Sequence, residues 1–209
     1  MLKTNTSAGF SLIELMVGLA IVALLLGLGL PSLSAYLANS KIHAAASNFS
    51  ADLQFARAEA IRRNGGVGLI LTSDPPVVCN VTDATASAAG PNWMVRVLLA
   101  APDLVTCTNP AKTLQHQLLQ AKSAAEGATQ VVVAGGVSNL NFTGLGSTDQ
   151  AATVSFDFSN PSGGACVAPV PPATVGGPMR CLRVQVTVGG QVRVCDPAVT
   201  TAGDSRTCS

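Results

Sequence analysis

A single carboxylate stands inside a long apolar stretch near the start of the chain. Residues 10–30 are apolar or small apart from Glu14, and no further charged residue follows before Lys41. As a helix this stretch would be about 31 Å long, close to the thickness of the hydrocarbon core of a bilayer. Because a charge is costly at that depth, Glu14 predicts a functional site that needs a positively charged partner.

The residues around Glu14 resemble the N-terminal signature of type IV pilins and type II secretion pseudopilins. In that superfamily a short polar leader ends in Gly, Phe follows, and Glu is the fifth mature residue. The leader here would be residues 1–9, which end in Gly9. The resemblance implies cleavage between Gly9 and Phe10 by a prepilin peptidase and N-methylation of Phe10. It also implies that Glu14 pairs with the amine of a neighbouring subunit.

Two other interpretations of this stretch account for fewer of its residues. An ordinary membrane anchor would place Glu14 at the level of the lipid headgroups, but it leaves the Gly-Phe pair unexplained. A secretory signal peptide would be cut near Ser32-Leu33-Ser34. For that class the apolar run is long, and Glu14 interrupts it.

Six cysteines, all located after the apolar stretch, predict disulfide bonds in an oxidising compartment. Sequence alone does not choose among the 15 pairings that six cysteines allow. Our expectation is sequential pairing, in which each bridge closes a loop containing Pro or Gly. The expected pairs are Cys79–Cys107, Cys166–Cys181 and Cys195–Cys208.

The helix is expected to continue beyond the apolar stretch as an amphipathic segment. Apolar residues recur at three- and four-residue steps, as a helix that buries one face requires. They are Ile42, Ala46, Phe49, Leu53, Ala56 and Ala60, and charged residues from Lys41 to Arg63 supply the polar positions. The sequence DLQFARAEAIRRN of residues 52–64 resembles the helix end of the GspH/FimT family of minor pilins and minor pseudopilins. Asn64-Gly65-Gly66 predicts the end of the helix.

Beyond residue 66 the chain is predicted to be β-rich, which gives an α+β, pilin-like fold with a long N-terminal helix packed on an antiparallel sheet. The expected parts are the leader 1–9, the transmembrane half of the helix 10–30, its amphipathic half 31–64, and a globular domain 65–209. Strands are expected at 67–72, 93–99, 130–134, 137–143, 152–158, 181–188 and 191–195. Gly135-Gly136 and Gly189-Gly190 are expected to form hairpin turns. A short helix around 113–121, or an irregular segment, is expected between the strands at 93–99 and 130–134. Residues 79–91 and 161–178 would form loops.

No catalytic constellation is present in the sequence. His43 and His116 are far apart and lack cysteines or carboxylates at metal-ligand spacing, and Asp149 and Asp157 fit a loop and a strand face. Phosphate-binding, nucleophile-elbow and zinc-protease motifs are missing. We therefore expect no enzyme activity, no cofactor, no metal and no small-molecule substrate.

The last hairpin is a candidate site for DNA. Some family members that bind DNA carry Gly-Arg-x-Arg there, and the matching residues here are Gly190-Gln191-Val192-Arg193, so that Gln191 replaces the first arginine. Arg183 could lie beside Arg193 on the adjacent strand. The net charge of +1 does not favour nucleic-acid binding, and an ordinary solvated strand face remains the simpler interpretation.

The resemblance therefore implies a minor pilin of a type IV pilus, a single-pass protein of the bacterial inner membrane with a periplasmic domain. Its partners would be other pilins, a prepilin peptidase and the membrane. Two alternatives stay open: a DNA-binding minor pilin for natural transformation, and a GspH-type minor pseudopilin of type II secretion.

Overall fold

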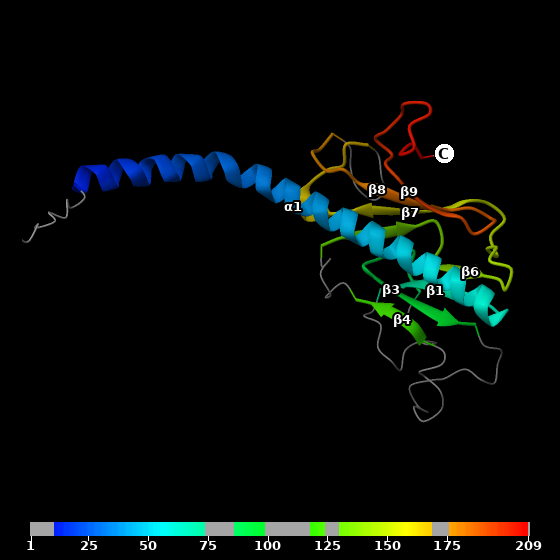
Figure 1. Ribbon diagram of the computed structural model, residues 1–209. Helices are drawn as coiled ribbons and strands as arrows, with labels where there is room; N and C mark the ends of the chain where they lie inside the picture. Colours follow the sequence, from blue (N-terminus) through cyan, green and yellow to red (C-terminus); the bar gives the residue numbers. More distant parts are fainter. Residues whose placement is uncertain (1–10, 74–85, 99–117, 124–129, 169–175, 209) are drawn as a thin grey trace, which may run out of the picture. The chain divides into compact units, whose positions relative to one another are not determined.

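The computed structural model describes residues 11–73, 86–98, 118–123, 130–168 and 176–208. It contains helix α1 (Leu12–Arg63), the short 3₁₀ helix η1 (Pro161–Gly163) and two antiparallel sheets. The chain divides into two compact units, Met1–Leu37 and Ala38–Ser209. In the second unit the C-terminal part of α1 packs against both sheets around one core (Figure 1). The predicted α+β class is therefore confirmed.

The end of α1 follows from the residues that stop it. Asn64 adopts a left-handed conformation with φ of 48°. Its N–H donates to the carbonyl of Ile61, and the N–H of Gly65 donates to the carbonyl of Ala60. These two hydrogen bonds satisfy carbonyl groups that the last turn would otherwise leave unpaired. The predicted helix end at about residue 64 is confirmed.

The predicted apolar stripe of the helix forms the centre of the core. All six of its residues from Ile42 to Ala60 are fully buried. Phe49 lies between the two sheets, with its ring centroid 5.2 Å from that of Trp93 in one sheet. In the other sheet the centroids of Phe156 and Phe158 are 4.9 Å and 5.3 Å away. One aromatic side chain thus holds the helix and both sheets together.

Among the described residues, four strands form the first sheet and five form the second. The first has the order β4-β3-β1-β6, with β1 (Val67–Thr72), β3 (Asn92–Val97), β4 (Leu118–Lys122) and β6 (Asn139–Phe142). The second has the order β2-β5-β7-β8-β9, with β2 (Ala89–Gly90), β5 (Val132–Gly135), β7 (Val154–Ser159), β8 (Leu182–Val186) and β9 (Val192–Cys195). All pairings between neighbouring strands are antiparallel. The predicted strand 67–72 and the predicted final hairpin are confirmed.

The predicted hairpin around Gly135-Gly136 is wrong. Strand β5 ends at Gly135 in the second sheet, whereas β6 belongs to the first, so the chain crosses between sheets here. At Ser138 the chain is already bonded to the first sheet, since the N–H of Leu71 in β1 donates to the carbonyl of Ser138 at 2.8 Å. A Cβ at Gly135 would lie 2.6 Å from the carbonyl oxygen of Val137, which explains why glycine occupies this crossing.

Neither of the two expectations for residues 113–121, a short helix or an irregular segment, is correct for the described residues. Residues from Leu118 onward form β4, which pairs with β3 from Trp93 to Arg96 at the edge of the first sheet. Pairing with an available edge thus overrides the helical preference of Leu, Gln, Ala and Lys. Residues 99–117 lie outside the described part of the chain.

Two of the three expected disulfides are present, Cys166–Cys181 and Cys195–Cys208, with Cα–Cα distances of 5.6 Å and 5.2 Å. The first joins the loop after β7 to the start of β8. The second holds the C-terminal segment against β9. The expected pair Cys79–Cys107 lies outside the described residues.

Candidate functional site

The first candidate site is the apolar part of α1 that carries Glu14. This side chain lies in the first turn of the helix, and all residues from 11 to 25 are exposed. Leu12 and Ile13 expose 76% and 70% of their surface. Gly9 and Phe10 lie outside the described residues. Within the described part of the chain, no helix combines the length and the apolar character needed to traverse a bilayer.

The second candidate site is the β8–β9 hairpin with its arginines. Arg183 donates from Nε to a carboxylate oxygen of Asp157 at 2.6 Å and from Nη2 to the other oxygen at 3.1 Å. The carboxylate raises the pKa of the Arg183 guanidinium. Arg183 lies opposite Cys195 in the register, and Arg193 lies opposite Gln185. The two arginines are thus on adjacent strands as predicted, but two positions apart.

The guanidinium of Arg193 is hydrogen-bonded to the C-terminal segment. Its Nη2 donates to the carbonyl oxygens of Ser205 and Thr207 at 2.8 Å and 2.6 Å. The Cys195–Cys208 bridge fixes the same segment beside the strand. Both candidate DNA-binding arginines therefore have acceptors inside the chain, which sequence spacing alone could not reveal.

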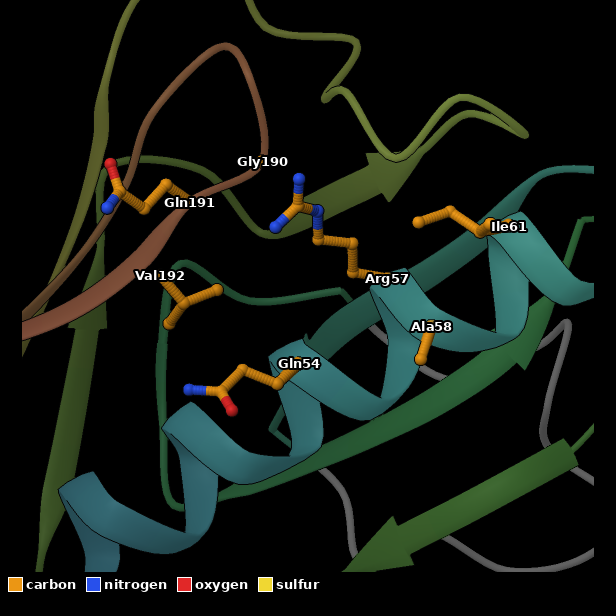
Figure 2. Close-up of a pocket in the computed structure, with 7 residues that line it drawn as sticks. All are labelled: Gln54, Arg57, Ala58, Ile61, Gly190, Gln191 and Val192. Atoms are coloured by element: carbon orange, nitrogen blue, oxygen red, sulfur yellow. The ribbon is translucent and has the colours of Figure 1, made fainter.

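A groove lies between α1 and the turn of this hairpin, and we call it the helix–hairpin groove (Figure 2). Its volume is about 380 Å³. Arg57 and Ile61 line it from the helix, and Gly190, Gln191 and Val192 line it from the hairpin. The guanidinium of Arg57 points toward the turn, so a helix residue that sequence analysis treated only as a polar position becomes part of a site.

The buried carboxylate of Asp52 was also missed. Asp52 is only 4% exposed, and its Oδ2 accepts a 2.7 Å hydrogen bond from the indole N–H of Trp93. Burial raises the pKa of Asp52, although the bond from Trp93, the charge of Lys122 and a bond from Gln120 act in the opposite direction. The signal was available in the sequence, because position 52 lies three residues after Phe49 and falls on the apolar stripe.

We expect Asp52→Asn to raise the free energy of unfolding at pH 7, and Asp52→Ala to lower it by about 1–3 kcal/mol. Asparagine keeps an acceptor for Trp93 without burying a charge, whereas alanine leaves the indole N–H unpaired. The raised pKa means that the folded state binds more protons. The carboxyl group therefore stabilises the fold most below pH 3.8, and this stability is lost as the pH rises through the folded-state pKa.

Urea titrations of the full chain in mild detergent, followed by circular dichroism at several pH values, measure both effects. The advantage of Asp52→Asn should shrink below pH 4. The assignment would be contradicted if the stability advantage of Asp52→Asn over the unchanged chain were smaller at pH 7 than at pH 3.

Among the described residues, no three His, Cys, Asp or Glu side chains form a group suited to a metal ion. His43 is exposed on α1 and lines a cavity of about 290 Å³ with Arg180, Asp196 and Arg206. The carboxylate of Asp196 pairs with Arg180 at 3.4 Å. His116 lies outside the described residues.

Comparison with known proteins gives two family matches. The family described as Type II transport protein GspH matches residues 45–190, and the prokaryotic N-terminal methylation motif matches residues 4–30. No curated protein matches the chain.

Among solved structures, two crystal forms of the type IV minor pilin FimU of Pseudomonas aeruginosa are similar to this chain, each at 14% identity. The first has a TM-score of 0.48 and covers 74% of this chain and 88% of FimU. For the second, the TM-score is 0.45 and the coverages are 73% and 90%.

An exposed apolar helix with one acid and a helix-on-sheet domain define a pilin-like subunit, a class whose work is structural rather than enzymatic. The match to the GspH family spans more than half of the residues, so this chain belongs to the GspH family.

Proposed function

We propose that this chain is a minor pilin of a type IV pilus and that it enters the filament through the apolar part of α1. Before assembly, residues 10–30 would hold it as a single-pass protein in the bacterial inner membrane. The amphipathic half 31–64 and the β-rich domain 65–209 would lie on the periplasmic side. After assembly the subunit would be part of a pilus at the cell surface.

The observation that carries this proposal is the exposure of the apolar residues from 11 to 25 around one acidic side chain. A helix that is apolar on all sides is stable only where lipid or other helices surround it. The match of the methylation motif to residues 4–30 supports the same interpretation. Inside a filament, the helices of neighbouring pilins would supply the missing contacts.

In this proposal Glu14 needs a cation, and processing of the chain supplies it. Cleavage between Gly9 and Phe10 by a prepilin peptidase creates an amine, which is then methylated. In a surrounding of low dielectric, the amine of one subunit and the carboxylate of Glu14 in the next attract each other strongly. The pair would set the axial register between the two subunits.

Mass spectrometry of the chain purified from its native membrane tests the proposal. We expect the mature protein to lack residues 1–9 and to begin with N-methylated Phe10. A protein that retains Met1, or that begins at any other residue, would overturn the proposed maturation.

A GspH-type minor pseudopilin of the type II secretion system is the second candidate, favoured by the description of the matching family. Both candidates use the apolar helix and Glu14 in the same way and differ in the machine they join. Detection of the chain in sheared pili, or in complexes with secretion pseudopilins, distinguishes them. The genes beside its own provide an independent indication.

DNA binding, adhesion and twitching are finer roles that a minor pilin could serve. For DNA binding, Arg183 and Arg193 would have to exchange their internal acceptors for phosphate oxygens. A gel-shift titration at two salt concentrations tests this, because phosphate contacts weaken steeply with salt. Retardation that Arg193→Ala removes would support the role, and a shift unaffected by this change would exclude this site.

A further inference from the structure

Arg57 lies in the helix–hairpin groove and has no counter-ion among the residues that the structure describes. Its Nε donates to the carbonyl of Gly146 at 3.0 Å, and its Nη2 donates to the carbonyl of Gly189 at 3.2 Å. Both acceptors are neutral, and Arg57 forms no ion pair within the described part of the chain. Its Nη1 has no acceptor among the same residues, so the guanidinium can still bind an anion.

The two carbonyl contacts hold the guanidinium in one place. Gly146 and Gly190 have φ of 79° and 77°, which bring the two turns close together beside Arg57. A Cβ on Gly190 would collide with the carbonyl oxygen of Gly146. Because the cation is already positioned, a ligand that binds it loses little additional side-chain freedom.

The groove lies beside an open strand edge. Strand β9 is the last strand of the second sheet, and Thr187 donates from its N–H to the carbonyl of Gln191. In an antiparallel pair these groups alternate in direction, so the N–H and C=O of Val192 and Val194 point away from β8. Neither residue bonds along this outer edge within the described residues. The next outward N–H, of Asp196, already donates to the carbonyl of Arg206.

We propose that the groove and this edge together bind an extended peptide segment that carries one carboxylate side chain. The backbone of the segment would pair with Val192 and Val194, and its carboxylate would bind the guanidinium of Arg57. That the segment belongs to a neighbouring filament subunit rests on the proposed function. The binding chemistry itself does not.

A peptide fits these features better than a nucleic acid. Strand addition needs alternating donors and acceptors, which a peptide backbone provides and a phosphate backbone does not. Nucleic-acid binding increases with the number of cations, whereas Arg57 is the one basic residue among the described residues that line this groove. Planar carboxylates also match the fixed fork of a guanidinium.

The experiment uses the full chain in detergent micelles and two synthetic pentapeptides with blocked ends. One has the sequence TVEVT and the other is TVQVT, which has the same shape without the charge. NMR titration is expected to shift the amides of Val192 and Val194 and the Nε–H of Arg57. We expect TVEVT to bind at least about tenfold more tightly than TVQVT, as a charge-assisted bond to the guanidinium requires.

Variants separate the two parts of the site. Arg57→Gln should remove the preference for TVEVT. Since Arg57 also holds two turns, Gln54→Glu provides a second test. Gln54 lines the groove from the helix, one turn before Arg57, so this change leaves the bonds to the two turns intact, adds a carboxylate to the groove and should weaken TVEVT about tenfold. Val194→Pro, which removes one outward N–H, should weaken both peptides alike. Arg62→Gln, on the same helix but outside the groove, should change nothing.

Equal binding of the two peptides, or no binding of either at millimolar concentration, would overturn the proposal. So would an oligonucleotide of single-stranded DNA that shifts the same amides at lower concentration than TVEVT. None of these measurements depends on filament assembly, so this site and the proposed function can fail separately.

Discussion

Replacing Glu14 with alanine is expected to lower incorporation of the chain into filaments by more than about tenfold, while the folded domain and membrane insertion remain unchanged. The variant leaves the proposed amine of a neighbouring subunit without its carboxylate. Removing one member of a buried pair costs about 3–5 kcal/mol, enough to exclude the subunit from most assembly events. Quantitative immunoblots of sheared filaments, compared with the membrane fraction, measure the ratio.

Glu59→Ala is the matched control for this experiment. Glu59 lies on the same helix, but it pairs with Arg62 and Arg63 at 2.7 Å and 2.8 Å outside the apolar stretch. These bonds lower the pKa of Glu59 to about 2, so the residue is charged at pH 7 like an ordinary surface acid. We expect normal incorporation of this variant. If Glu14→Ala is incorporated as well as Glu59→Ala, the pairing role of Glu14 is excluded.

Replacing Phe49 with alanine is expected to destabilise the domain by about 3–5 kcal/mol, the range found for buried aromatic side chains. Phe49 is fully buried and contacts Trp93, Phe156 and Phe158. Its loss leaves a cavity where the helix meets both sheets, and none of these elements can fill it alone. Urea unfolding of the full chain in mild detergent, followed by far-ultraviolet circular dichroism, measures the change.

Phe55→Ala provides the comparison, because Phe55 is on the same helix but 37% exposed. We expect it to cost at most about 1 kcal/mol. The difference between the two variants isolates burial from helix propensity, since both make the same substitution in the interior of α1. Equal losses would mean that the core is not centred on Phe49.

The sequence predicted the local elements with the strongest periodicity. The six apolar residues from Ile42 to Ala60 are all buried, because a helix repeats every 3.6 residues and its buried face can be identified without knowing the partner. A strand repeats every two residues, so the alternation from Val154 to Phe158 likewise predicted β7. Gly189-Gly190 marked the turn of the last hairpin. Glu14 was identifiable because it is the single charge in its stretch.

The sequence could not predict which sheet each strand would join. The two segments around Gly135-Gly136 have the pattern of a hairpin, yet β5 and β6 lie in different sheets, because a turn signal gives the position of a bend and not the partner of the next strand. Leu118–Lys122 forms a strand only because the edge of β3 is available to it.

By itself, the sequence determined the long helix, its buried stripe, its single acid among apolar residues and the family to which the chain belongs. The tertiary structure decided how polar side chains are used. Asp52 binds Trp93, Arg183 binds Asp157, and Arg57 lies in a groove beside an open strand. Periodicity depends on neighbours along one element and is therefore readable from the chain. The contacts of these three side chains instead join residues separated by 26 to 132 positions, and only the folded arrangement brings them together.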